Sequence, residues 1–410
     1  AQTVTVDVET APWFELLDAT SKQVQVPAKA VTSVVFKLRA KKVGTFGFKA
    51  TAQGSGGSDA VKRSVQVLPD GARHEIVRSG PLEAGVTRET LTIPQSAIDG
   101  ASELYVKVYP GLLAEIREGF EAMVKKPHGC FEQISSATYP NVLVLQYLKR
   151  AGASSAAFEK RARAFIADGY QRMVGHEVDG GGFSLWGEAP GDIVLTAFGL
   201  MLLSDMGTVQ FVDPALVKRL QSWLLTQQRF DGAFDLPPGE FYDTQHAGLE
   251  GRKRITAYVA WALAKSGFQG PELTKALSFL RTTAGATNDP YTLALVANAL
   301  LQASAKDVEG LAAVDALAKV ATAKGTDAVY WKSEGCSLTK GYGDSLTAET
   351  TAFAVGALLM AKTPSSLALA AKGLRYLAAS KDAEGGYGTT QATVLTLRAL
   401  LMALEARGGD

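Results

Sequence analysis

Short runs of alternating apolar and polar residues occupy much of the first 70 positions of the chain. They are rich in valine, threonine and phenylalanine and cover residues 3–8, 31–38, 45–51 and 60–68. Alternation with β-branched residues is typical of half-buried strands. A glycine and serine run at residues 54–58 predicts a loop tip between the last two strands. We therefore expect an antiparallel β-sandwich over residues 1–70.

A turn-rich break at Pro69-Asp70-Gly71 ends this first region. Three further strand-like runs follow it at residues 74–77, 87–93 and 104–109. Three strands are too few to close a core alone. We therefore expect residues 71–110 to be the first part of a second small β domain whose other strands lie outside this chain. One larger sandwich over residues 1–109 is the alternative.

The apolar positions take on a helical period from Leu112 and keep it almost to the end of the chain. Four times, a glycine-rich loop with an aromatic residue precedes a helix with threonine in its first turns. The aromatic residues are Phe183, Phe234, Tyr342 and Tyr387, and the threonines are Thr196, Thr256, Thr347, Thr389 and Thr390. Such a repeat predicts stacked helix pairs. Periodicity alone leaves open whether the pairs close into a ring or form an open solenoid.

The charge balance and the apolar windows limit the classes of function. The 42 Lys and Arg residues match 41 Asp and Glu residues, so the net charge of +1 gives no global field for nucleic acid or an anionic membrane. Apolar windows such as residues 291–305 are shorter than the roughly 20 residues that span a bilayer. No signal peptide is visible before the strand-like sequence at Ala1. We expect a fragment or a processed chain.

Cysteine and histidine are too scarce for a disulfide scaffold or a metal centre. The chain has two cysteines, Cys130 and Cys336, and four histidines without the paired spacing of metal ligands. We therefore expect no metal and no cofactor. A single disulfide between the two cysteines stays open.

The chemistry of the chain is concentrated in the run Lys126-Pro127-His128-Gly129-Cys130-Phe131-Glu132-Gln133. A thiol and a glutamine amide this close can condense, with loss of ammonia, into an internal thioester from Sγ of Cys130 to Cδ of Gln133. Such a bond stores an acyl group. A helix expected to begin soon after Cys130 favours its thiolate. The alternative is a buried cysteine that acts only as a small hydrophobic residue.

Together with Tyr139-Pro140-Asn141, this run resembles the thioester region of the α2-macroglobulin and complement family, whose motif is Gly-Cys-x-Glu-Gln. Similar segments follow in the family's order, at residues 195–198, 223–232 and 386–393. The resemblance covers residues 111–406 and implies an all-α thioester domain, an α/α toroid, over residues 111–408. It also implies a multidomain chain, with a macroglobulin-like β-sandwich over 1–70 and the first part of a CUB-like β domain over 71–110. The family's bait region and receptor-binding domain are not recognisable here.

The resemblance assigns roles to individual residues of the motif. Cys130 matches the thioester cysteine, Gln133 its acyl partner and Glu132 the motif glutamate. Phe131 stands at a variable position that is commonly glycine in vertebrate members, and it is similar to the bulky residues of bacterial members. Together with the lack of paired cysteines, this similarity implies a bacterial-type α2-macroglobulin.

Three side chains near the bond are candidates for supporting roles. Phe131 and Tyr139 are expected to shield the thioester from water, with ordinary aromatic packing as an equal alternative. His128 stands where many members have tyrosine and is a candidate for tuning Cys130. A loop histidine without a role is the stronger alternative for His128.

Members of the family that acylate hydroxyl groups use a histidine in the loop that falls at residues 238–248 here. Aligning Ala247-Gly248-Leu249 with the family's Gly-Gly-Leu places Tyr242 at that position, and His246 lies four residues later. The resemblance therefore implies a preference for amines over hydroxyl groups, unless a shifted loop brings His246 into place.

For the whole chain the resemblance implies a single-use covalent trap, an endopeptidase inhibitor and not an enzyme, in the extracellular space or the periplasm. Its partners would be proteases or other proteins with exposed amines, and the missing domains of its own full-length chain. One alternative is a prenyltransferase-like or terpene-cyclase-like enzyme on the same toroid, although no zinc-ligand set or aspartate-rich motif is evident. The other is a non-covalent adhesion or scaffold module.

Overall fold

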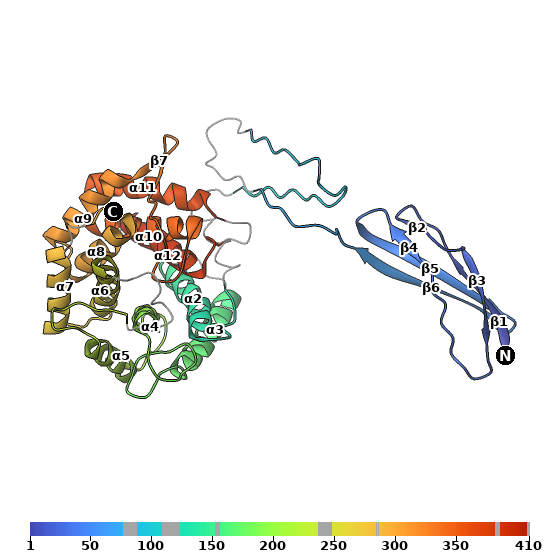
Figure 1. Cartoon of the computed structure of the whole chain (residues 1–410), viewed down its shortest axis with the longest axis horizontal. Coiled ribbons are helices and arrows are strands. Elements are labelled where there is room, and N and C mark those ends of the chain that lie inside the picture. Colours follow the sequence, from blue (N-terminus) through green and yellow to red (C-terminus); the bar gives the residue numbers. More distant parts are fainter. Residues whose placement is uncertain are drawn as a thin grey trace. The chain divides into compact units, whose positions relative to one another are not determined.

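The computed structural model of the protein describes residues 1–76, 88–108, 124–151, 156–236, 248–283, 285, 287–381 and 386–407. The described residues up to 108 belong to one compact unit, and those from 124 onward belong to a second unit. Figure 1 shows both units coloured along the sequence.

The first unit is built on a four-stranded antiparallel sheet in the order β3-β1-β5-β6. Its strands are β1 (Gln2–Val8), β3 (Ser21–Val26), β5 (Gly44–Gly54) and β6 (Gly57–Val67). A separate antiparallel pair joins β2 (Phe14–Leu16) to β4 (Leu38–Ala40). The runs expected at residues 3–8, 45–51 and 60–68 are therefore strands, and Gly54 pairs with Gly57 at the turn between β5 and β6.

Aromatic side chains form a small core in this unit. Trp13 and Phe14 are buried. The ring of Trp13 stacks on Phe46 of β5 with 5.3 Å between centroids, and Phe14 meets Phe48 at 5.9 Å. These contacts place β2 and the residue before it against the four-stranded sheet.

Several expected strands are not formed. In the run at residues 31–38 only Leu38 lies in a strand, and the described residues of the runs at 74–77, 87–93 and 104–109 contain no strand. Val31 and Tyr105 are 100% and 76% exposed. Strand propensity mainly reflects packing on a half-buried sheet surface. These segments lack such a surface, so their β-branched residues form no ladder.

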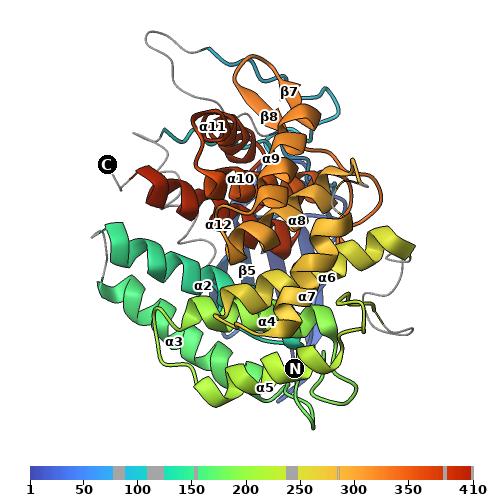
Figure 2. The ribbon, with the colours of Figure 1, turned by 90° about the vertical axis from the view of Figure 1, so that its left-hand side faces the viewer.

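Eleven helices are described in the second unit. They are α2 (Phe131–Ala151), α3 (Ala156–Val174), α4 (Ile193–Met206), α5 (Pro214–Thr226), α6 (Gly248–Lys265), α7 (Pro271–Thr283), α8 (Pro290–Ala303), α9 (Val308–Val320), α10 (Gly343–Ala361), α11 (Pro364–Ala379) and α12 (Thr390–Arg407). The even-numbered helices contact one another in sequence order, and α12 contacts α2. Each odd-numbered helix packs on the helix before it, farther from the middle of the unit (Figures 1 and 2).

A β-hairpin interrupts this helical region, which the helical period did not predict. Strands β7 (Thr322–Lys324) and β8 (Ala328–Tyr330) lie between α9 and α10. The Tyr330 ring stacks on Tyr376 of α11 with 5.0 Å between centroids. This contact attaches the hairpin to the side of α11.

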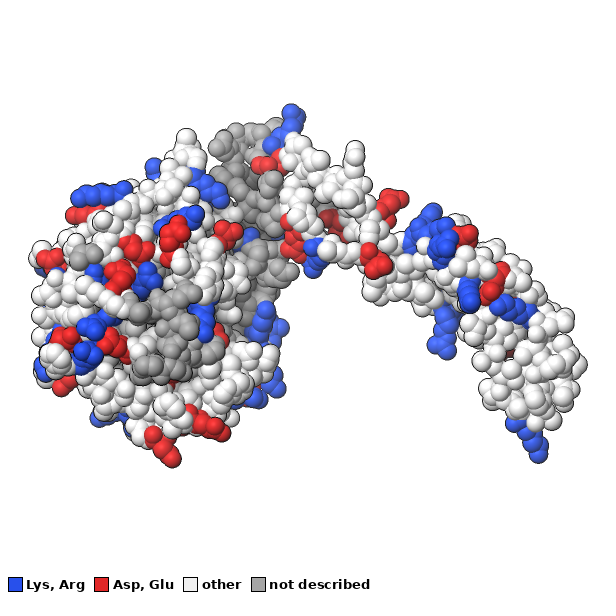
Figure 3. Space-filling view, in the orientation of Figure 1, with Lys and Arg blue, Asp and Glu red and all other residues white. Residues whose placement is uncertain are grey.

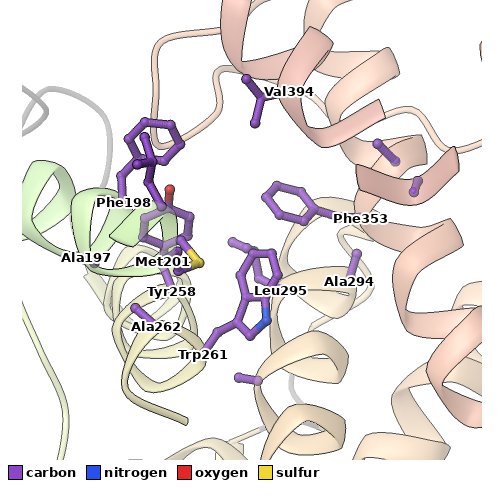
Figure 4. Close-up of a cluster of buried hydrophobic side chains, with 14 of the residues drawn as sticks. Ala197, Phe198, Met201, Tyr258, Trp261, Ala262, Ala294, Leu295, Phe353 and Val394 are labelled. Carbon is purple, nitrogen blue, oxygen red and sulfur yellow. The ribbon is translucent and has the colours of Figure 1, made fainter. Parts of the chain in front are cut away.

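The even-numbered helices meet in a continuous hydrophobic core, shown in part in Figure 4. Phe198 of α4 and both Tyr258 and Trp261 of α6 are buried. Trp261 meets Phe353 of α10 edge to face, with 5.6 Å between ring centroids. Because α4 is buried on nearly all sides, it is a central helix and not a surface helix.

The repeated threonines bind the loop aromatic residues through the backbone. In each case an aromatic residue donates its N–H to a threonine hydroxyl: Phe183 to Thr196 at 2.8 Å, Phe234 to Thr256 at 2.9 Å, Trp331 to Thr351 at 3.1 Å and Tyr387 to Thr393 at 3.0 Å. The first two pairs match the sequence pattern. The third pair is Trp331 with Thr351, where the pattern indicated Tyr342 and Thr347. The fourth pair is Tyr387 with Thr393, where the pattern indicated Thr389 or Thr390. In each repeat this hydrogen bond thus fixes the loop to the helix that follows it.

Within the described ranges, none of the helices is both long and apolar enough to cross a bilayer. On the face shown in Figure 3, basic and acidic side chains are interspersed over both units.

Candidate functional site

Cys130 lies at the start of α2 and is tied to it through the backbone. Its carbonyl oxygen accepts the first helical hydrogen bond, from Ile134 N–H at 2.9 Å. The next N–H along the chain, that of Phe131, donates to the carbonyl of Leu185 at 3.0 Å. The helix therefore begins at a defined residue, and its first turn is attached to the loop that precedes α4.

The structure brings Gln133 back onto Cys130. The backbone N–H of Cys130 donates to Oε1 of Gln133 over 3.2 Å. Gly129 makes this approach possible, because a Cβ atom there would lie 1.8 Å from that oxygen. Gly129 also has φ +91, in the left-handed region that favours glycine. Glycine is thus required before the cysteine for two separate reasons.

The two residues of the candidate thioester differ in their exposure. Cys130 is only 9% exposed, whereas Gln133 is an exposed residue. The second cysteine, Cys336, is also buried, and the two cysteines are not joined by a disulfide. Cys130 therefore lies on the inner side of the helix start, and Gln133 is accessible from solvent.

Phe131 points into the core of the helical unit. It is fully buried, its ring stacks on Phe183 with 4.5 Å between centroids, and His176 meets it edge on at 5.9 Å. On α4, a Cβ at Gly199 would come within 2.9 Å of the Phe131 ring. The side chain thus anchors the first turn of α2 against α4 and the loop before it. Shielding of a thioester by Phe131 stays a prediction.

Tyr139 lies two turns farther along α2, in a buried polar cluster. Its hydroxyl donates to Asp205 Oδ2 at 2.6 Å, and Lys265 lies 2.5 Å from Oδ1 of the same carboxylate. Burial, aided by the charge of Asp205, raises the pKa of Tyr139 well above its usual value, so the phenol remains a donor. Burial would raise the pKa of Asp205, but Lys265 and Arg398 hold it below its usual value. The contacts of Tyr139 join α2, α4 and α6, and its shielding role stays a prediction.

Glu132 lies between Cys130 and Gln133 in the chain, and His128 lies two residues before Cys130. Burial raises the pKa of the half-buried Glu132 above its usual value, while the charge of Lys340 opposes that rise. Lys340 lies in the loop before α10, so this loop approaches the motif as well. His128 is exposed.

Tyr242 and His246 lie outside the described residues, so the expected choice between amine and hydroxyl acceptors stays a prediction from the sequence.

Two contributors to the site were not expected from the sequence, and a third had no role assigned to it. The carbonyl of Leu185 and the carboxylate of Asp205 lie more than 50 residues from their partners, so no local pattern indicates them. Gly129 is different, because a glycine next to the cysteine is visible in the sequence and signals a backbone position with φ > 0 or a close approach.

Comparison with known proteins gives a consistent match for the helical unit. A family model described as the A-macroglobulin TED domain matches residues 106–402. The chain is 25% identical over 293 residues to thioester-containing protein 1 allele R1 of Anopheles gambiae, which covers 68% of this chain and 22% of that relative. Allele S1 of the same protein is 25% identical over 296 residues, and allele S3 is 24% identical over 296 residues. The matched segment spans 22% of the length of each of these two as well.

Proposed function

The chain belongs to the A-macroglobulin family through its TED domain, and from this we propose that Cys130 and Gln133 form the thioester of a complement-like or macroglobulin-like protein. The observation that carries the proposal is the hydrogen bond from Cys130 N–H to Gln133 Oε1 at 3.2 Å, which places the carboxamide over the start of α2. The thiol of Cys130 attacks Cδ of Gln133 and forms the S–C bond. The C–N bond breaks, and the amide nitrogen leaves as ammonia with the thiol proton.

The thioester then acts as an acyl donor to a target protein. An amine attacks Cδ of Gln133, the C–S bond breaks, and the sulfur takes up the proton that the amine loses. The products are an amide to Gln133 and a free Cys130 thiol. Support comes from the exposure of Gln133, because an amine on a large partner must reach this carbon from solvent. Since the bond is consumed once, the protein is a covalent trap and not a catalyst with turnover.

We propose amines as the preferred acceptors, on the sequence alone. Tyr242 occupies the position that the resemblance gives to a histidine in members that acylate hydroxyl groups, and His246 stands four residues later. Lysine side chains on the target are the most common source of such amines.

At the level of the whole protein, we propose a broad-spectrum endopeptidase inhibitor of bacterial type that acts outside the cytoplasm, in the extracellular space or the periplasm. Its partners are proteases or other proteins with exposed amines, and further domains of its own full-length chain. The matched relatives are much longer than this chain. The TED domain is the part of this chain that the family model matches.

We also propose the domain plan of a macroglobulin-like sandwich over residues 1–70, part of a CUB-like domain over 71–110 and an α/α toroid over 111–408. The return of the helix contacts from α12 to α2 supports a closed toroid, because the end helices of an open solenoid do not meet. The Trp13 and Phe14 contacts on β5 support a sandwich.

Intact mass spectrometry tests the thioester. We expect the native protein to be lighter than its sequence mass by one ammonia, and methylamine to add at Gln133 while one thiol becomes titratable. Cys130→Ala should show the full sequence mass and no methylamine adduct, whereas Cys336→Ala should behave as the wild type. A native protein at full sequence mass would refute the proposal. Target binding that is unchanged in Cys130→Ala would instead favour a scaffold module. The family match gives no support to an enzyme on the toroid.

A further inference from the structure

The Gln133 carboxamide has one orientation that satisfies its contacts. The backbone N–H of Cys130 can only donate, so the side-chain atom that faces it at 3.2 Å is the acceptor Oε1, and Nε2 points away. Gly129 lies under the same group. A Cβ atom added at Gly129 would lie 1.8 Å from Oε1 and 2.8 Å from Cδ. The oxygen is therefore held against a backbone donor, and the nitrogen is free to leave.

The donor is also placed at the positive end of a helix. Cys130 precedes α2, and its carbonyl accepts the hydrogen bond from Ile134 N–H, so its own N–H is one of the first groups that have no partner within the helix. The following N–H, of Phe131, is already bound to Leu185. The helix dipole favours negative charge at this end. An oxygen that becomes negative next to Cys130 N–H is therefore stabilised by both effects.

We propose that the backbone N–H of Cys130 is the oxyanion donor of the thioester chemistry. This inference rests on the proposed thioester. When the Cys130 thiol attacks Cδ, the carbonyl π electrons move onto Oε1 and give a tetrahedral centre with a negative oxygen. The same oxygen becomes negative when an amine later attacks the thioester carbon. One donor thus serves both formation of the bond with loss of ammonia and its opening with release of Cys130.

The length of the hydrogen bond from Cys130 N–H to Gln133 Oε1 before the reaction agrees with this role. A distance of 3.2 Å is at the long end for N–H to oxygen, so the contact is weak before reaction. It strengthens as charge develops on the oxygen, and only an interaction that is stronger in the transition state accelerates a reaction. Gly129 acts as a positioning residue, because any side chain there would push the oxygen off the donor.

Gly129→Ala tests the donor, and the chain offers a matched control. Gly180 has φ +89, close to the +91 of Gly129, yet a Cβ at Gly180 meets nothing within 4 Å. Gly180→Ala therefore introduces the same left-handed strain without displacing an oxygen. The difference between the two variants isolates the contact with Gln133.

We expect Gly129→Ala to react with methylamine ~10- to 100-fold more slowly than Gly180→Ala. This effect is at or below the lower end of the range of about 100- to 1000-fold found when an oxyanion donor is lost, because Gln133 is exposed to competing water. The infrared band of the thioester carbonyl, identified with ¹³C-labelled glutamine, should lie at higher frequency in Gly129→Ala, since a hydrogen bond lowers that frequency. Equal rates and equal bands in the two variants would overturn the inference.

The wild type provides a second measurement that does not depend on the variant folding. Its thioester band should lie below that of a simple alkyl thioester in a dry aprotic solvent. A wild-type band at the unbonded frequency, in a protein whose mass shows the loss of ammonia, would refute the donor but leave the thioester intact. A wild type at full sequence mass would instead refute the proposed function itself.

Discussion

A buried glutamate in the helical unit predicts that the stability of the protein changes with pH, and the structure gives the sign and size of this change. Glu349 of α10 is 1% exposed, and Oε1 accepts a hydrogen bond from the Tyr291 hydroxyl at 3.2 Å. The Thr339 hydroxyl lies 3.4 Å from the same oxygen. Burial raises the pKa of Glu349 to about 7, although hydrogen bonds from Ser337, Tyr291 and Thr339 oppose the rise. The carboxyl is therefore partly protonated at neutral pH.

The sign and size of its effect on stability follow from this pKa. Since the pKa of the folded state lies above the usual value of 4.5, the contribution of Glu349 is fully present below about pH 4.5 and is lost as the pH rises through 7. A tenfold change in an equilibrium constant is worth about 1.4 kcal/mol, so the complete loss amounts to ~3 kcal/mol. Glu349→Gln keeps the shape of the side chain and removes its titration.

Denaturation in urea at several pH values between 5 and 8 measures this effect. The free energy of unfolding of the wild type, relative to Glu349→Gln, should fall by ~2 to 3 kcal/mol across that interval. Glu334 lies in the loop before α10 and is exposed, so Glu334→Gln is the control and should follow the wild type. A wild-type curve that runs parallel to that of Glu349→Gln would show that Glu349 does not titrate in this range.

Three further changes test the surroundings of the motif. Phe131→Ala removes the stack on Phe183 and should lower the free energy of unfolding by ~3 to 5 kcal/mol in the same urea assay; a cost below about 1 kcal/mol would contradict the anchoring role. Tyr139→Phe removes the hydrogen bond to Asp205 and should cost ~1 to 3 kcal/mol at pH 7. That cost should shrink as acid protonates Asp205 below its already lowered pKa, and a pH-independent cost would argue against the charged partner. Tyr242→His should increase glycerol incorporation relative to methylamine, and an unchanged ratio would remove the basis for the amine preference.

The closeness of Cys130 and Gln133 could be predicted from the sequence because it is local. Cys130 and Gln133 are three residues apart, so any conformation that starts a helix there brings the carboxamide near the thiol. The supporting contacts could not be predicted in this way. Leu185 and Asp205 reach α2 only because α4 and the loop before it pack there, which depends on the whole helical unit.

The strands show the same division between local and distant causes. Alternation located β1, β5 and β6, each of which has a partner strand. Strands β1 and β5 have a partly buried face, and β6 is partly buried at Val65 and Val67. The run at residues 31–38 has similar composition, but a strand forms only where Leu38 pairs with β2. Composition alone did not distinguish these cases, because strand propensity depends on the surface that the strand meets.

Phe131 and Gln133, two residues apart in the motif, differ in burial, and this difference explains how a bulky Phe131 is accommodated. Phe131 is fully buried between Phe183 and α4, whereas Gln133 is exposed. On a helix, positions two apart point in different directions, so the aromatic ring occupies no space beside the Gln133 side chain, where the proposed amine would attack. The ring and the bond from Phe131 N–H to Leu185 instead hold the first turn of α2 in place. A backbone donor accelerates a reaction only if it keeps its position as charge develops, because reorganisation would consume the energy that it supplies. In the proposed chemistry, the buried Phe131 thus provides the rigidity that the backbone donor to Gln133 requires.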